Sequence, residues 1–292
     1  MENTENRLKL LYQLFKPGLA FSIVITVVPA LLLGPHVPSL SIIFYTLLGT
    51  GLSAMASFAY NQLLEQRTDA MMKRTAKRVL PSGKLDPLLV HVVGSSMLGA
   101  GILILLLKAG WLAAALALFS FLFYVFVYTL GLKPHTEHST VLGGICGAIG
   151  PLIGEAAIRH TITLDGVLLF LLVFLWQPPH FWALAIFRLE DYKAAGFPLL
   201  PITKGIPLTV QQMIFYQLLL CITIVLLWFP AGIGSYVFLV FSLFPGLYIL
   251  GRMIALRKDP SPQATRSVFF LTIFHNMLWH GSLTLELLWK KW

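Results

Sequence analysis

The chain contains about nine long apolar runs, and these constrain its fold more than any other feature. Each run is near the roughly 20 residues that a helix needs to cross the hydrocarbon core of a bilayer. The runs are continuous rather than alternating, which excludes a transmembrane β-barrel. We therefore expect membrane-spanning helices at 17–35, 38–60, 88–107, 110–131, 141–158, 166–187, 209–229, 234–251 and 268–289.

The composition agrees with a membrane protein. Only 11% of the 292 residues are charged and 57% are hydrophobic, whereas a soluble domain carries about 25% charged residues. No segment between the runs is long enough to form a separate soluble domain. The first residues carry acids and no cleavage pattern, so we expect no signal or transit peptide. The sequence therefore predicts one all-α, polytopic membrane domain over residues 1–292, with helices around a central cavity.

The basic residues predict the orientation of the chain. If the N-terminus is cytoplasmic, 17 of the 21 Lys and Arg residues lie on the cytoplasmic side and 4 on the other. This bias follows the positive-inside rule and places the two longest loops, about 61–87 and 188–208, in the cytoplasm. A cell (inner) membrane is the simplest location. The net charge of +9 then belongs to a membrane-facing cytoplasmic surface that attracts anions. No basic domain lies outside the membrane, so we expect no nucleic-acid binding.

A polar stripe begins where the second expected span meets the cytoplasm. Asn61, Glu65, Asp69 and Lys73 are four residues apart, so we expect them on one side of a helix. Carboxylates one turn apart suit a hard cation such as Mg²⁺. The stripe therefore predicts a metal-bound phosphate site for a substrate with a charged head and an apolar tail.

Further cations follow the stripe. A Pro-Ser-Gly turn at 81–83 ends this loop and places Lys73, Arg74 and Arg78 near the carboxylates. The alternative interpretation is an ordinary positive-inside loop in which a few acids balance the bases. Unpaired acids at the membrane boundary are costly without a role, which favours a functional site.

A second cluster closes the sixth span. The proline pair at 178–179 predicts a kink or an interruption of the helix. His180, Arg188 and Asp191 share a helical face if the helix resumes after the prolines. An intramembrane histidine near Trp182 is a functional candidate, and the alternative is a histidine that only packs. His275 and His280 in the last span are weaker candidates of the same kind.

The two clusters lie at the same membrane depth. Asp191 and Lys193 are at the cytoplasmic exit of the sixth span, as Asp69 and Lys73 are at that of the second. We therefore expect both loops to hold one metal-bound anion between them.

The fifth span is rich in glycine. Glycines four residues apart at 143–154 predict close packing between helices. Glu155 follows this run and is expected near the far interface. Cys146 and Cys221 lie inside spans at no metal-ligand spacing, so we expect both to pack.

The two loop motifs resemble those of the UbiA-type intramembrane prenyltransferases. The family pattern Asn-x-x-x-Asp/Glu-x-x-x-Asp is matched by Asn61, Glu65 and Asp69. The branch that farnesylates heme is marked by Met-x-Arg-Thr, matched at 72–75. Its second signature is Pro-Pro-His-Phe-Trp-Ala-Leu-Ala, then Asp-Tyr-x-x-Ala-Gly-x-Pro and Leu-Pro, matched within 178–201. The resemblance covers essentially the whole chain.

The resemblance implies a reaction and its participants. Farnesyl diphosphate would donate its farnesyl group to the 2-vinyl group of heme B within membrane lipid, with Mg²⁺ as cofactor. Heme A synthase or terminal oxidase assembly would be partners downstream. The implied catalytic residues and metal ligands are Asn61, Glu65, Asp69 and Asp191. The implied substrate-binding residues are Lys73, Arg74, Arg78, Lys193, Tyr192, His180, Trp182 and Arg188.

The chain also departs from the family pattern. Relatives commonly read acid-Arg-Asp-x-Asp, whereas here Gln66 and Arg67 follow Glu65, and Val79 replaces a proline after Arg78. The stripe is therefore less acidic, which predicts weaker metal binding or a divergent role. The alternatives are a quinone or other aromatic acceptor, and a non-catalytic heme-binding assembly protein. Ala195, where quinone-type relatives carry a second Asp, favours heme.

Overall fold

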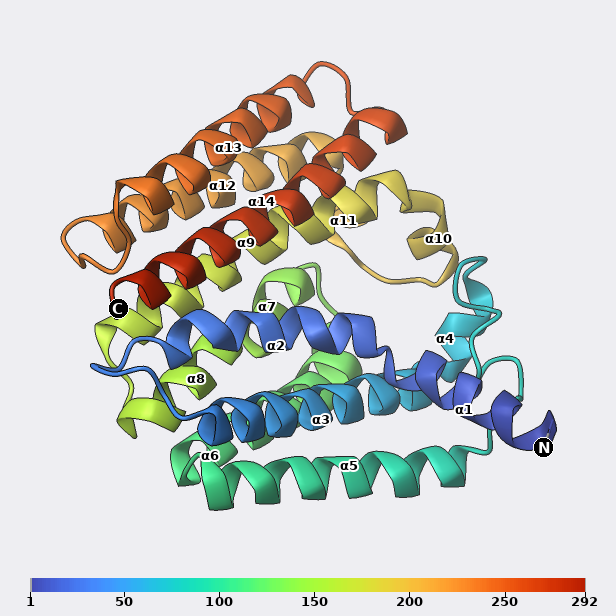
Figure 1. Ribbon diagram of the computed structural model, residues 1–292. Coiled ribbons are helices and arrows are strands. Elements are labelled where there is room, and N and C mark those ends of the chain that lie inside the picture. The colour runs from blue at the N-terminus through green and yellow to red at the C-terminus, as the bar shows by residue number, and fades with distance from the viewer. Residues whose placement is uncertain (1, 292) are drawn as a thin grey trace.

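The computed structural model describes residues 2–291, and this part of the chain is helical without strands. Figure 1 shows long helices lying side by side in one bundle. The elements are α1 (Glu2–Phe15), α2 (Pro17–Leu31), α3 (Leu40–Leu64), α4 (Gln66–Met71), α5 (Pro87–Lys108), α6 (Trp111–Leu122), the π-helix η1 (Phe123–Leu132), α7 (Ser139–Gly147), α8 (Gly150–Arg159), α9 (Leu164–Phe187), α10 (Leu189–Ala194), α11 (Leu200–Thr203), α12 (Ile206–Trp228), α13 (Tyr236–Ala255) and α14 (Pro262–Trp289).

The expected spans correspond to helical segments, although not all pass as spans by composition. Within the described residues, seven segments are long and apolar enough to cross a membrane. An eighth is formed if α1 and α2, which meet at a bend of 43°, count as one span. The ninth expected run lies in α14, which is 28 residues long. Buried His275 and His280 lower its apolar character, yet α14 packs against α9 and α13 like the other spans.

The arrangement puts both polar loops at one end of the bundle. In Figure 1, α4 and α10 lie at the end that carries the N-terminus, and the C-terminus lies at the opposite end. The upper half of the view contains α9, α12, α13 and α14, and the lower half contains α2, α3, α5 and α6. Both loops therefore lie at the same end of the bundle (Figure 1).

Local sequence signals explain where several helices begin. The carboxylate of Asp86 accepts a hydrogen bond from Leu88 N at 2.8 Å, directly before Pro87. Ser261 accepts from Ala264 N at 3.3 Å before Pro262. A capping oxygen satisfies an otherwise free backbone N–H, and proline at the first helical position loses no hydrogen bond.

The glycine-rich fifth span is built for close packing. It forms α7 and α8, which are separated by a short break at 148–149. A Cβ atom at Gly150 would collide with the Thr26 side chain, and one at Gly154 with the Val27 carbonyl of α2. Only glycine lets α8 and α2 approach this closely, which supports the packing interpretation of the run.

Candidate functional site

Asn61, Glu65 and Asp69 of the polar stripe stay aligned although the helix is interrupted between α3 and α4. Glu65 N donates to Asn61 O at 2.9 Å, and Asp69 N donates to Glu65 O at 2.8 Å. These bonds keep the three residues stacked across the α3–α4 junction, and all three side chains are buried. The prediction that Lys73 extends the stripe is wrong. Because α4 ends at Met71, Lys73 leaves the helix and is exposed.

Each carboxylate of the stripe is paired with a cation. Lys133 Nζ lies 2.5 and 2.7 Å from the two oxygens of Glu65. Arg78 Nη1 lies 2.6 Å from Asp69 Oδ2. Arg78 was expected from the sequence, but Lys133 was not, since it lies 68 residues from Glu65 in the chain.

The π-helix η1 brings two residues to the stripe. Thr129 Oγ1 accepts from Asn61 Nδ2 at 3.2 Å, and Lys133 follows the last turn of η1. The Thr129 hydroxyl donates to Tyr124 O, five residues earlier. Wider π turns are rare and are frequently found at functional sites. Here the turn places a hydroxyl and an ammonium against one face of α3.

One carboxylate oxygen of the stripe is left without a partner. Asp69 has no exposed surface, and its Oδ1 atom accepts no hydrogen bond. A buried unpaired carboxylate oxygen costs free energy, so it points to a missing partner such as a cation. Asn61 supplies a further side-chain oxygen from the same stripe. Together they fit the oxygen ligands that Mg²⁺ prefers, although no group of three His, Cys, Asp or Glu side chains converges within the described residues.

The second polar loop packs directly onto the first. Met72 is buried in one apolar cluster with Ala195, Phe197 and Leu199. Lys133 Nζ also lies 4.6 Å from the centre of the Phe197 ring. The two loops are therefore in contact, which an anion site shared between them would require.

The short helix α10 supplies Asp191 and Tyr192. Both are partly buried, whereas Arg188 and Lys193 are exposed. Burial raises the pKa of the Tyr192 phenol; the Arg74 guanidinium opposes this rise and the Glu65 carboxylate adds to it. Tyr192 therefore stays protonated, as a potential donor between charges from both loops.

The expected shared face of His180, Arg188 and Asp191 does not form. The helix α9 continues through the proline pair at 178–179 and ends at Phe187, so Asp191 belongs to a separate helix. His180 is wedged against α14: its Nδ1 is 2.9 Å from Thr272 Oγ1. Its ring is stacked between two aromatic rings, Trp176 and Phe269, each at 4.5 Å. This geometry fits the packing alternative.

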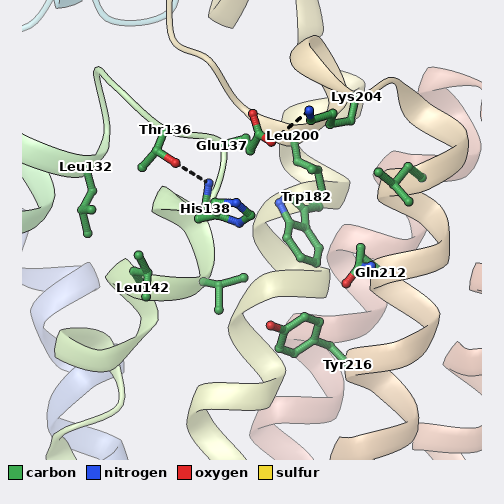
Figure 2. A pocket seen from close by; sticks show the side chains of 12 residues that line it. Leu132, Thr136, Glu137, His138, Leu142, Trp182, Leu200, Lys204, Gln212 and Tyr216 are labelled. Atoms are coloured by element: carbon green, nitrogen blue, oxygen red, sulfur yellow. Dashed lines mark hydrogen bonds and ion pairs between the residues drawn. The ribbon is translucent and has the colours of Figure 1, made fainter.

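Trp182 lies on the other side of α9 and lines a cavity. The cavity has a volume of about 620 Å³ and is bounded by residues of α7, α9, α11 and α12. Figure 2 shows Trp182 facing His138 across this space. His180 and Trp182 belong to one signature but lie in different surroundings. His180 contacts α14, whereas Trp182 lines the cavity.

The departures from the family pattern have structural roles. Gln66 Nε2 donates to Leu80 O at 2.9 Å, which ties α4 to the following turn. Val79 is buried in an apolar cluster with Leu14 and Leu85. Arg67 is exposed. Gln66 and Val79 therefore make contacts within the first loop, whereas Arg67 does not.

Lys16 is a second cation that sequence reasoning missed. It occupies the bend between α1 and α2 with φ 46°, a conformation that non-glycine residues rarely adopt. Its ammonium lies 5.9 Å from the centre of the Phe58 ring on α3. A strained backbone at a lysine that reaches the helix carrying the stripe points to a functional contribution.

Comparison with known proteins gives consistent matches. Residues 22–278 match the UbiA prenyltransferase family. The chain is 39% identical over 264 residues to the protoheme IX farnesyltransferase of Leptospira interrogans serogroup Icterohaemorrhagiae serovar copenhageni (strain Fiocruz L1-130), covering 90% of this chain and 91% of that protein.

Two solved structures share the fold. A structure described as digeranylgeranylglyceryl phosphate synthase in membranes matches with a TM-score of 0.80 at 17% identity, covering 97% of this chain and 99% of that one. A UbiA homolog from Archaeoglobus fulgidus, bound to GPP and Mg²⁺, matches with a TM-score of 0.62 at 14% identity, over 94% and 99% of the two chains.

Proposed function

Because this chain belongs to the UbiA prenyltransferase family, we propose that it transfers the farnesyl group of farnesyl diphosphate to the 2-vinyl group of heme B. The C1–oxygen bond of farnesyl diphosphate breaks, and diphosphate leaves with the electron pair. The electron-rich vinyl group attacks the allylic cation. Water then adds to the resulting cation on the inner vinyl carbon and loses a proton, which gives the hydroxyethylfarnesyl side chain of heme O.

The observation that carries the proposal is the 39% identity, over nine tenths of the chain, to a protoheme IX farnesyltransferase. The geometry supplies the parts that such a reaction needs. Buried carboxylates and cations lie together at one end of an apolar bundle. An apolar interior shields an allylic cation from premature reaction with water.

We propose that Asn61, Glu65, Asp69 and Asp191 hold Mg²⁺. The unpaired Asp69 Oδ1 supports this assignment, as does the Mg²⁺ bound by the related homolog from Archaeoglobus fulgidus. Magnesium, when bound, supplies positive charge that neutralises the diphosphate oxygens.

The cations of the site would stabilise the leaving group. Lys133 and Arg78 are already held at the carboxylates and would turn toward phosphate oxygens when a metal takes their place. The Tyr192 phenol would donate a hydrogen bond from the second loop. The exposed cations that we assign to the entry of the diphosphate are Lys73, Arg74, Arg188 and Lys193.

The proposal includes the cellular setting. The protein is a multi-pass membrane protein, and we propose that it lies in the cell inner membrane with its N-terminus and active-site loops cytoplasmic. Residues 1–292 would form one prenyltransferase domain, of which the first and last residues lie outside the described part. The product would pass to heme A synthase or to terminal oxidase assembly.

The direct test is product analysis. Purified protein in detergent is incubated with heme B, farnesyl diphosphate and Mg²⁺, and heme O is detected by mass spectrometry. We expect heme O from the wild type and none above background from Asp69→Asn. The matched control is Asp86→Asn on the same loop, which keeps its capping role because Asn also caps helices.

The outcome also separates the alternatives. If the wild type makes no heme O but prenylates an added aromatic or quinone acceptor, the acceptor assignment is wrong. If it binds heme and makes no product with any acceptor, it is a non-catalytic heme-binding protein.

A further inference from the structure

The cavity beside Trp182 is unlike the tightly packed interior around it. Its volume of about 620 Å³ falls within the range of about 300–1,000 Å³ that small-molecule sites occupy. Its walls are largely apolar and include Leu132 and Leu200. Leu142 and Leu208 line it as well and are exposed on the outer surface of the bundle. An amphiphile could therefore enter from the lipid.

The cavity also contains an unpaired donor. Trp182 is only 2% exposed, and its Nε1–H has no hydrogen-bond partner. The indole is fixed by an edge-to-face contact with Tyr216 at 5.6 Å. A buried N–H without an acceptor is costly, so this donor points to an absent ligand with an acceptor oxygen.

Two further polar features surround the same space. Figure 2 shows the His138 imidazole directed toward Trp182, with the indole nitrogen on the side of the cavity that carries Glu137 and Lys204. Glu137 and Lys204 form a half-exposed ion pair at 3.5 Å. Thr136 Oγ1 accepts from His138 N at 3.3 Å, which fixes the turn that presents the imidazole.

We propose that this cavity binds the porphyrin acceptor, with His138 as the axial ligand of its iron. The inference rests on the proposed function, because only a heme acceptor joins a flat apolar ring, a carboxylate and a metal in one molecule. The apolar walls cover the ring, and the imidazole ligates iron as histidine does in other heme sites. One propionate accepts from Trp182 Nε1–H and pairs with Lys204. A phospholipid would use the apolar walls and the lysine but not the imidazole.

The cavity lies next to the acid cluster. Leu132 lines the cavity, and the following residue, Lys133, pairs with Glu65. Trp182 lies near the end of α9, directly before the short helix α10 that carries Asp191. An acceptor held here is therefore adjacent to the place where the prenyl diphosphate is expected.

The test is a titration of the purified protein with ferric heme, followed by the Soret band. We expect the wild type to show the shift of histidine ligation. His138→Ala should lose that shift and bind heme at least about tenfold more weakly. His135→Ala, an exposed histidine three residues away on the same turn, is the matched control and should match the wild type. His180→Ala should also keep the shift, because that ring is held against α14.

A second pair of variants tests the space itself. Leu208→Trp fills the cavity mouth and should weaken heme binding by about tenfold while farnesyl diphosphate binding, which reports a folded protein, stays unchanged. Leu226→Trp places the same bulk on an equally exposed site of α12 outside the cavity and should change nothing. Wild-type heme binding without heme O would refute the proposed function alone. Unchanged heme spectra and affinities in both His138→Ala and Leu208→Trp would overturn the porphyrin site.

Discussion

Each end of the bundle buries a carboxylate beside an arginine, but the hydrogen bonding of the two carboxylates differs. At the C-terminal end, Glu155 accepts from Arg159 Nη1 at 3.1 Å and from Thr163 Oγ1 at 2.5 Å through Oε1. Its Oε2 accepts from Thr163 N at 3.0 Å. At the loop end, Asp69 pairs with Arg78 through one oxygen only, and the other oxygen has no partner.

This difference separates a structural carboxylate from a functional one. Arg159 also binds Asp165 at 2.9 Å and the Leu33 carbonyl, so the Glu155 network joins α8 to the start of α9 and the end of α2. A fully satisfied network rigidifies a fold. Asp69 keeps one oxygen available for a ligand, at a cost in stability. Buried charge alone therefore does not identify the site; an unsatisfied oxygen within a cluster of buried acids and their cations does.

The largest expected effect is the removal of metal. Chelation with EDTA should abolish product formation, and added Mg²⁺ should restore it, because Mg²⁺ supplies the charge that the diphosphate requires. The protein should stay folded in EDTA, because Arg78 and Lys133 pair with Asp69 and Glu65 without a metal. Activity that persists after exhaustive chelation would contradict the Mg²⁺ assignment.

Asp69→Asn should cause the second-largest loss of activity. Loss of this carboxylate removes a ligand and should lower kcat/KM for farnesyl diphosphate by about 100- to 1,000-fold, as for other charge-stabilising groups. The unfolding temperature should fall, because a neutral amide weakens the buried pair with Arg78. A lower unfolding temperature with unchanged kinetics would assign Asp69 a purely structural role.

Lys133→Met should have a smaller effect on activity. It removes one of several cations near the leaving group and leaves Glu65 without its partner. We expect a loss in kcat/KM of about 10- to 100-fold, measured by initial rates of heme O formation. Lys84→Met, at an exposed lysine of the first loop, is the control and should stay near the wild-type rate.

Glu155→Gln should change stability and leave activity nearly untouched. A glutamine NH₂ cannot accept from Thr163 N, so the variant should lose about 1–3 kcal/mol of stability. A lower thermal unfolding midpoint in detergent would report this loss. Glu190→Gln breaks an exposed pair with Lys193 and should shift stability by less than about 1 kcal/mol. Equal midpoints for the two variants would contradict the structural role of Glu155.

Local patterns predicted much of the fold and part of the site. The apolar runs marked the helices because burial in lipid requires continuous apolar segments. The predicted alignment of Asn61, Glu65 and Asp69 is correct because backbone hydrogen bonds continue across the α3–α4 junction. The same spacing predicted the wrong position for Lys73, because the residue pattern does not show that the helix ends at Met71.

Long-range partners could not be predicted in this way. Lys133 reaches Glu65 only because a π-helix turns it toward α3, and a single sequence carries no signal for that pairing. The roles of His180 and Trp182 depend on which face of α9 meets α14 and which meets α12. The prolines at 178–179 predicted a kink or an interruption, and α9 is not interrupted there.

Binding of radiolabelled farnesyl diphosphate tests the central claim most directly. The wild type, Asp69→Asn and Glu155→Gln are compared in detergent with and without Mg²⁺, at a temperature where all three are folded. If Asp69 and not Glu155 holds the metal, binding should depend on Mg²⁺ in the wild type and in Glu155→Gln. It should be lost in Asp69→Asn. Equal binding by all three proteins, or loss in Glu155→Gln alone, would contradict a diphosphate site at the loop end.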